Sequence, residues 1–234
     1  MLKGKFYLLW LLFLFGIIFC ASSQPRFEIP GQFVFDIYVN QLNESTAKLP
    51  LKTWSSRGVN IYYLQEIKFA NDKLSLNPGI GISSEKFSFS SDITLERQQG
   101  TSSLVIKNLS PSWDVHKTFL SAEYFDIPIE LRFQTAKGYR AFRFAVGFRV
   151  GRLIHSRTKI KYENFEGDII KIKEQNNYLL NRWRYGVIAR IGLGKLNVFG
   201  AYNLSPLFQE NALEQEVPNY NPSSFTLGIT FFTF

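Results

Sequence analysis

The segment Phe142-Arg-Phe-Ala-Val-Gly-Phe-Arg-Val-Gly151 alternates strictly between a large apolar residue and a polar or small one. Successive side chains of a β-strand point to opposite faces, so the Phe and Val side chains would share one face and the Arg, Ala and Gly residues the other. A helix would instead need apolar residues three or four positions apart. The segment therefore predicts a strand that separates an apolar environment from a polar one.

Seven further segments follow the same two-residue period, and helical periodicity is nearly absent past residue 30. They cover residues 32–40, 59–68, 74–83, 125–133, 183–192, 196–203 and 225–231. Tight turns near residues 70–72, 135–138 and 192–194 alternate with connections of about 14 to 30 residues. Short turns at one end and long loops at the other are typical of outer-membrane barrels. We therefore predict an all-β, eight-stranded antiparallel up-and-down transmembrane β-barrel.

A secreted soluble barrel that binds a small apolar ligand is the alternative, because it alternates in the same way but turns its apolar face inward. Two features of the segments favour the membrane version. Glycines lie on the polar face, where a narrow interior needs small residues: Gly79, Gly81, Gly147, Gly151, Gly186 and Gly228. Aromatic residues lie near the ends of the apolar face, as in an interfacial girdle: Phe69, Phe133, Trp183, Tyr202 and Phe231.

The N-terminus has the order of a secretory signal peptide: Lys3 and Lys5, an apolar stretch over residues 6–19, and small residues after Cys20. We expect residues 1–23 to be the signal peptide and residues 24–234 to form the barrel with four long extracellular loops. A membrane anchor is disfavoured because residues 6–21 would span only about 24 Å as a helix, short of a hydrocarbon core of about 30 Å. Lipidation of Cys20 is a further alternative, but the preceding Phe19 is bulkier than such signals normally carry.

Charged residues on the polar faces are the most conspicuous candidates for a site. They are Asp36, Glu66, Lys68, Asp126, Glu130, Arg132, Arg143, Arg149, Arg184 and Arg190. An eight-stranded barrel leaves no room for an aqueous channel, so these side chains should pair with one another and fill the interior. We predict a structural network, with an ion or proton path as the alternative.

Few residues offer enzymatic or metal chemistry. The chain has one Cys and two His, so it lacks a disulfide framework and a cysteine-based zinc site, and we expect no metal and no cofactor. A lipid-active enzyme at the extracellular rim would need a nucleophile beside His155. Its neighbour Ser156 would point to the opposite face, and His116 beside Asp114 fits a solvated loop. We expect no enzymatic activity.

Two of the long connections carry candidate interaction surfaces. Arg157, Lys159, Lys161, Lys171 and Lys173 alternate around residues 164–167, which predicts a hairpin with a basic face. That face could meet lipopolysaccharide phosphates or an acidic partner, or simply be solvated. We expect no nucleic-acid partner despite the net charge of +8, because export is expected and the basic residues divide between the barrel interior and the loops. The connection over residues 85–116 carries apolar residues that either fold over the barrel mouth or dock on another protein. They are Phe87, Phe89, Trp113 and the run 104–106.

Residues 181–192, 196–208 and 225–232 resemble the C-terminal half of the PorT-like outer-membrane β-barrel domains of Bacteroidetes, and residues 77–82 and 127–132 resemble earlier strands of that family. The resemblance implies a barrel in the outer membrane of a Gram-negative bacterium. A few PorT-type members are accessory factors of the type IX secretion and gliding apparatus. The chain's end also resembles the signal read by the barrel-insertion machinery, through Thr226, Gly228, Phe231 and Phe234.

The expected function is that of a non-enzymatic structural or accessory subunit. Its long loops or outer wall would dock onto an envelope machine for secretion, motility or barrel assembly. The expected partners are outer-membrane lipid and lipopolysaccharide, the barrel-assembly machinery, and an envelope protein complex.

Overall fold

The computed structural model describes residues 31–44, 48–69, 73–90, 92–98, 103–136, 141–194, 196–213 and 215–232. The chain divides into two compact units, residues 1–30 and 31–234, and all described residues belong to the second. The expected signal peptide with Cys20, the turn at residues 70–72 and the terminal Phe234 lie outside the described residues. Among those that are described, no helix is long and apolar enough to cross a membrane.

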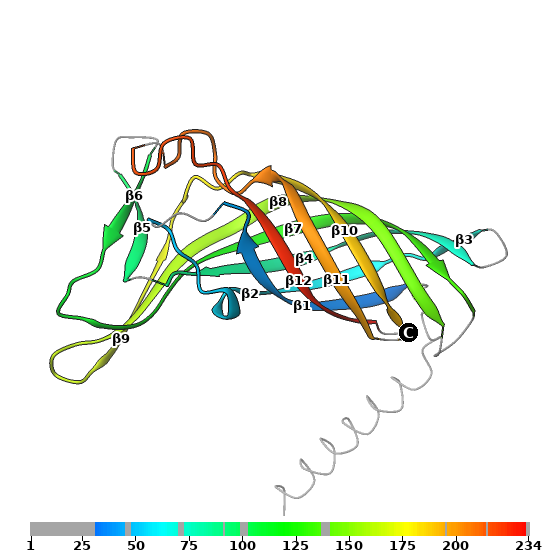
Figure 1. Cartoon of the computed structure of the whole chain (residues 1–234), viewed down its shortest axis with the longest axis horizontal. Helices are drawn as coiled ribbons and strands as arrows, with labels where there is room; N and C mark the ends of the chain where they lie inside the picture. Colours follow the sequence, from blue (N-terminus) through cyan, green and yellow to red (C-terminus); the bar gives the residue numbers. More distant parts are fainter. Residues whose placement is uncertain are drawn as a thin grey trace, which may run out of the picture. The chain divides into compact units, whose positions relative to one another are not determined.

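Eight antiparallel strands close into a barrel (Figure 1). β1 pairs with both β2 and β12, and β8 pairs with β10, so hydrogen bonding runs through β1-β2-β4-β7-β8-β10-β11-β12 and returns to β1. The predicted eight-stranded up-and-down barrel is therefore confirmed. Its strands are β1 (Gln32–Leu42), β2 (Arg57–Leu64), β4 (Leu74–Ser88), β7 (Asp114–Gln134), β8 (Phe142–Glu163), β10 (Trp183–Leu193), β11 (Leu196–Pro206) and β12 (Ser223–Phe232).

Shorter elements extend the barrel wall at both ends. The predicted segment 59–68 is interrupted: β2 ends at Leu64, and β3 (Ile67–Phe69) pairs separately with β4. At the other end β9 (Ile169–Gln175) pairs with β8, and β5 (Ile93–Arg97) pairs with β6 (Leu104–Asn108) in a separate hairpin. A 3-10 turn, η1 (Thr53–Ser55), precedes β2. We call the end with β9 and the β5–β6 hairpin the long-loop end, and the opposite end the short-turn end.

The apolar face of the barrel points outward. On β1, Phe35 and Ile37 are exposed, whereas Asp36 and Asn40 on the alternate positions are buried. The same division holds on β8, where Phe144 and Phe148 are exposed and Arg149 is buried. A soluble barrel with an apolar cavity would show the reverse, so that alternative is excluded. The exposed apolar side chains form the belt that contacts lipid in a transmembrane barrel.

Three strands are much longer than the predicted segments. β7 has 21 residues, β8 has 22 and β4 has 15. At about 3.3 Å per residue, β8 reaches roughly 70 Å, far beyond the apolar belt of roughly 25 Å in a barrel of this type. The expectation that a loop begins at Glu85 is wrong, because β4 continues to Ser88.

Beyond the apolar belt the two faces of these strands reverse in polarity, so that the outward face is polar and the inward face is apolar. On β4, Ile82 faces outward within the belt, but Lys86 occupies the outward phase further on and the inward Phe87 is buried. On β8, Lys159 faces outward while Ile160 is buried. The outer face meets water there, whereas the inner face is covered by loops.

An apolar cluster fills the long-loop end, and it contains apolar residues of the connection that is expected from its sequence either to fold over the barrel mouth or to dock on another protein. Phe87 and Leu120 on the strand extensions pack with Leu104 of the β5–β6 hairpin, and with Leu180 and Phe208 from later connections. Phe89 joins this cluster too. Trp113 packs in a separate, smaller cluster and stacks on Tyr162 of β8 with ring centroids 3.9 Å apart. These apolar residues therefore fold onto the barrel and form a cap, which we define as the cluster Leu42, Leu49, Phe87, Phe89, Ile93, Leu95, Leu104, Leu120, Ala122, Tyr124, Tyr178, Leu179, Leu180, Leu207, Phe208, Ala212 and Leu213.

Gly151 is required by the interior side chains that lie against it. A β-carbon at this position would lie 2.1 Å from Asp126 Oδ1 and 2.9 Å from Arg184 Nε. We expect Gly151→Ala to lower the free energy of unfolding by about 1–3 kcal/mol, because the ion pair would have to move. The matched control is Gly200→Ala, whose β-carbon would approach only Thr226 O, at 3.8 Å. Urea unfolding in detergent micelles would measure both, and equal effects would contradict the close approach.

Candidate functional site

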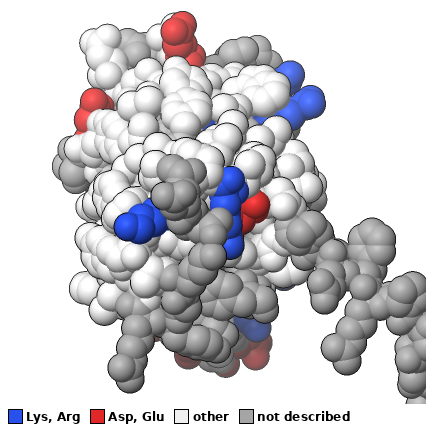
Figure 2. Space-filling view, turned by 90° about the vertical axis from the view of Figure 1, so that its right-hand side faces the viewer, with Lys and Arg blue, Asp and Glu red and all other residues white. Residues whose placement is uncertain are grey.

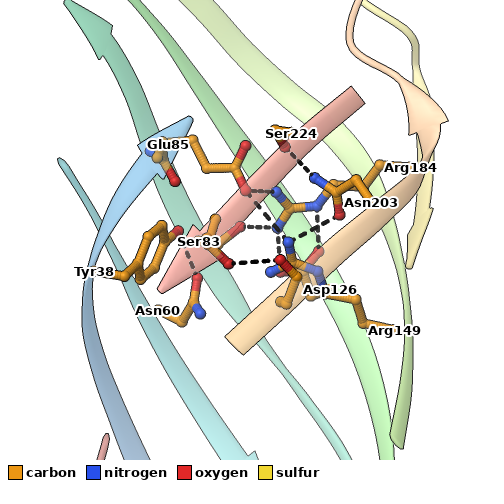
Figure 3. A network of polar contacts seen from close by, with 12 residues as sticks. Tyr38, Asn60, Ser83, Glu85, Asp126, Arg149, Arg184, Asn203 and Ser224 are labelled. Atoms are coloured by element: carbon orange, nitrogen blue, oxygen red, sulfur yellow. Dashed lines mark hydrogen bonds and ion pairs between the residues drawn. The ribbon is translucent and has the colours of Figure 1, made fainter. Parts of the chain in front are cut away.

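Arg184 lies at the centre of a buried network in the barrel interior (Figure 3). Its Nε donates to Asp126 Oδ1 at 3.1 Å and its Nη2 to Asp126 Oδ2 at 2.5 Å, which is a bidentate ion pair between β10 and β7. Its Nη1 donates to Glu85 Oε1 on β4 at 2.5 Å, and its Nη2 also contacts the hydroxyl of Ser83. One guanidinium therefore joins three strands and partners two carboxylates.

Arg149 and several uncharged groups complete this first network. Arg149 Nη2 donates to Asn203 Oδ1 at 2.9 Å and lies 3.5 Å from Glu85 Oε1. Asn203 in turn donates to Ser224 Oγ at 2.6 Å. The Tyr62 hydroxyl donates to Asp126 Oδ2 at 2.9 Å. Figure 3 shows Glu85, Asp126, Arg149 and Asn203 converging on Arg184 from several strands.

Arg190 organises a second network. It donates to both oxygens of Asp36, at 2.6 and 3.0 Å, and its Nε donates to Glu130 Oε1 at 2.9 Å. Asp36 also accepts from Thr230 at 2.7 Å and from Asn60 at 2.8 Å. The Asp36 carboxylate thus has charged and neutral donors around it, as a buried charge requires.

The other predicted interior residues divide into two groups. Arg132 is buried: its Nη1 donates to Gln32 Oε1 at 2.8 Å and its Nη2 lies 3.9 Å from Glu130. Arg143 is buried and donates to the carbonyl of Gly194 at 2.8 Å. Glu66 and Lys68 instead pair with each other at 3.3 Å, and the Lys68 side chain is 43% exposed. The prediction of Lys68 as an interior residue is wrong, because the break after β2 takes this stretch out of the barrel's alternation.

Glu85 is the interior residue that the sequence prediction missed. Its side chain is buried and partners both Arg184 and Arg149. The two-residue alternation continues through Ser83, Glu85 and Phe87, and this alternation predicts a strand that extends past Ser83. The inward-facing residues change from polar to apolar between Glu85 and Phe87. A segment defined by one polar face therefore ends too early.

Charged side chains occupy the barrel interior. The described buried charges are the carboxylates of Asp36, Glu85, Asp126 and Glu130 and the guanidiniums of Arg132, Arg143, Arg149, Arg184 and Arg190. The charges nearly balance, and most of these groups pair with one another across the barrel. Arg149 Nε and Nη1, Glu85 Oε2 and Glu130 Oε2 are buried without a hydrogen-bond partner among the described residues. With the apolar cap above them, these described side chains fill much of the narrow interior of an eight-stranded barrel.

The histidines do not form a nucleophile and base pair with the residues beside them. The Ser156 side chain points inward and donates to Asn176 O at 2.8 Å, whereas His155 Nδ1 lies 3.1 Å from Gln175 Nε2. An open groove of about 440 Å³ passes beside His155. His116 lies 3.3 Å from Glu163, and with Asp114 these residues offer ligand atoms within 4.8 Å of one another on an exposed surface.

The predicted basic hairpin is formed by the outer part of β8 and by β9. Lys159 lies opposite Lys173 and Lys161 opposite Lys171, while Arg157 lies opposite Gln175. Arg157 also pairs with Glu123 of β7 at 3.0 Å. The five basic residues therefore share the outward face of one surface at the long-loop end.

The C-terminal assembly residues lie on the last strand. Thr226 is buried in the interior phase, and Phe231 is exposed in the lipid-facing phase. Gly228 lies opposite Tyr38 of β1, where a β-carbon would come within 2.5 Å of the Tyr38 side chain. This strand therefore places polar and small residues inward and an aromatic residue outward, as the resemblance implies.

Closure of the sheet, the outward apolar belt and the ion-paired interior together define an outer-membrane β-barrel. The model of the family described as "Outer membrane protein beta-barrel domain" matches residues 25–209, most of the chain. The protein belongs to this family.

The chain is also similar to two solved structures of low sequence identity. The attachment invasion locus protein Ail of Yersinia pestis is 12% identical, with 88% of this chain and 100% of Ail covered and a TM-score of 0.33. A mutant form of the Rh. blastica porin is 8% identical, with 87% of this chain and 98% of the porin covered and a TM-score of 0.20. Curated proteins gave no significant match.

Proposed function

We propose that this protein is a non-enzymatic accessory or structural subunit of the outer membrane, which acts through its outer wall and long loops. The observation that carries the proposal is the filled interior. The networks around Arg184 and Arg190 occupy the barrel, and the cap closes the long-loop end. With the interior occupied in this way, the outer wall and the long loops are the surfaces available to a partner.

The finer parts of the proposal rest on the sequence. The N-terminal segment has the features of a signal peptide, which supports export in a Gram-negative bacterium. The resemblance to PorT-like domains supports docking onto an envelope machine such as a secretion, motility or barrel-assembly complex. The pattern of Thr226, Gly228 and Phe231 supports insertion by the barrel-assembly machinery, with short turns in the periplasm and long loops outside.

Purification of the tagged protein from its own membranes in mild detergent tests the accessory role. We expect mass spectrometry to identify one envelope protein in stoichiometric amount. A tagged barrel of similar size from the same membranes serves as the control for trapped lipid-phase proteins. Recovery of the barrel alone, or of the same proteins with the control barrel, would contradict the accessory role.

A lipid-active enzyme near His155 is the alternative that the groove beside this residue supports. The geometry disfavours it, because Ser156 faces the interior and hydrogen-bonds to a backbone carbonyl. We expect His155→Ala to leave the lipid A and phospholipid profiles of the cell unchanged. A changed acylation pattern in the mass spectra of extracted lipids would instead support the enzyme.

A further inference from the structure

The basic surface at the long-loop end is larger than the hairpin predicted from the sequence. Lys117 on β7 lies opposite Lys161, and Phe119 opposite Lys159. On β4, Lys86 lies opposite Ser121, which in turn lies opposite Arg157. These cross-strand neighbours form one continuous outward surface over four strands. We define this basic surface as Lys86, Lys117, Arg157, Lys159, Lys161, Lys171 and Lys173.

The charges of this basic surface are poorly balanced by protein carboxylates. Arg157 has Glu123 as its partner, and Glu163 at the distal end pairs with His116. None of the five described lysines from Lys117 to Lys173 has an ion pair with a described acidic residue. Like charges directly opposite on neighbouring strands destabilise a sheet, so the two Lys–Lys pairs of β8 and β9 disfavour the free state. Such an arrangement fits a surface that binds anions.

Three lysines surround a single aromatic ring within this surface. The ammonium groups of Lys86, Lys117 and Lys159 lie 5.4, 5.8 and 6.0 Å from the centroid of Phe119. Burial, together with the positive charges of Lys117, Arg57 and Lys159, lowers the pKa of Lys86 to about 8. A bound anion would offset this repulsion. The opposite, short-turn end carries scattered charged side chains of both signs on its described surface (Figure 2).

The height of the basic surface above the membrane indicates which anion it meets. With strands tilted by about 45°, each residue rises roughly 2.3 Å along the membrane normal, so Lys86 lies roughly 9 Å above Ile82 and Lys159 roughly 20 Å above Val150. Phospholipid headgroups occupy only about 5–7 Å on each side of the hydrocarbon core. A glycolipid whose sugars carry phosphates and carboxylates reaches the whole span.

We propose that the outward face of β4, β7, β8 and β9 is a binding site for lipopolysaccharide, in which the lysines contact the phosphate and carboxylate groups of its lipid A and inner sugar region. The apolar belt directly below Lys86 holds the acyl chains. Lipopolysaccharide thereby supplies the counter-charge that the protein lacks. This assignment rests on the proposed function above, in which the long loops lie on the extracellular side of the membrane.

The pKa of Lys86 gives an independent measurement of the crowded charges. Lys117→Gln removes a neighbouring positive charge, so we expect the pKa of Lys86 to rise from about 8 toward its ordinary value. NMR of protein carrying ¹³C-labelled lysine in detergent would follow the titration. Lys107→Gln is the control, since Lys107 pairs with Glu96 on the β5–β6 hairpin. An unchanged titration of Lys86 in the Lys117 variant would contradict the proximity.

Binding of rough lipopolysaccharide to the purified full chain in nanodiscs tests the site. We expect Lys159→Gln with Lys173→Gln to weaken binding by roughly tenfold or more, since each basic residue near an anionic lipid surface contributes about fivefold. Lys159→Arg with Lys173→Arg should retain binding. The matched control is Lys52→Gln with Lys107→Gln, which removes two exposed lysines outside the basic surface. Because the Gln variant relieves repulsion between opposed lysines, we expect it to fold at least as stably without the lipid.

Three lipids distinguish the possible occupants. We expect binding of intact lipopolysaccharide to exceed that of its dephosphorylated form and of phosphatidylglycerol at least about tenfold. Equal binding of phosphatidylglycerol would overturn the proposal in favour of a general anionic surface. Equal loss in the control variant, or no loss in the Lys159 and Lys173 variant, would also overturn it. None of these three results would affect the accessory role, which is decided by the purification from native membranes.

Discussion

Replacing Arg184 with Met is expected to lower the free energy of unfolding by about 3–5 kcal/mol, one of the two largest effects in the chain. The variant keeps most of the side-chain volume but removes the only guanidinium that contacts both Asp126 and Glu85 within 3.1 Å among the described residues. Both carboxylates are fully buried, so they would lose an opposite charge without gaining water. Glu85 would keep only the longer 3.5 Å contact with Arg149, and Asp126 would keep the hydrogen bond from Tyr62. The cost comes mainly from this incomplete compensation of the two buried carboxylates, because a buried ion pair itself adds little over apolar packing.

Equilibrium unfolding by urea in detergent micelles would measure this effect. Arg157→Met is the matched control, since Arg157 also pairs with a carboxylate, Glu123, but both side chains are partly exposed. We expect this control to lose at most about 1 kcal/mol, as exposed ion pairs do. Similar losses in the two variants would mean that the interior around Arg184 is hydrated and open.

Truncation of Phe208 is expected to release the cap from the barrel. Its side chain is buried among the apolar residues of the cap, and its backbone bridges to Leu180. Loss of a buried Phe side chain typically costs about 3–5 kcal/mol. Because the cap consists of connections and strand extensions outside the apolar belt, Phe208→Ala should open this region while the membrane-spanning part stays closed.

Amide hydrogen exchange read by mass spectrometry would locate the opening. We expect faster exchange in β5, β6 and the connection around Phe208, and unchanged exchange in β10, β11 and β12, which contribute no residue to the cap. Phe165→Ala is the control, because Phe165 at the tip of the β8–β9 hairpin is 87% exposed and its loss should change exchange little. Faster exchange throughout the barrel would contradict a cap that is separable from the membrane-spanning strands.

The eight strands were predictable because a barrel wall imposes one rule on every residue in the membrane. Each of the eight predicted segments overlaps a barrel strand, since the lipid on one side and the narrow interior on the other enforce the alternation. Eight of the ten predicted interior charges are buried, for the same reason. The polar face of Phe142–Gly151 is the clearest example: Arg143 and Arg149 point inward and both are buried.

The sequence prediction failed where the environment of a strand changes along its length. Outside the membrane the outer face meets water and the inner face meets the cap, so Lys86 and Phe87 reverse the polarity that Ile82 and Ser83 establish. A prediction that requires one face to stay polar along the whole strand therefore ends β4 too early and leaves out the buried Glu85. Partners of single side chains could not be predicted either, because Arg184 and Glu85 are brought together by the closure of the whole sheet.

Conductance across a planar lipid bilayer is the most direct test of the central claim that the interior is a closed plug. We expect the purified protein to insert, as judged by protection of its strands from protease, and to give no steps of current. Stable, ohmic current steps from the unmodified protein would contradict the account, because they would require a water-filled path past Arg184 and Arg190.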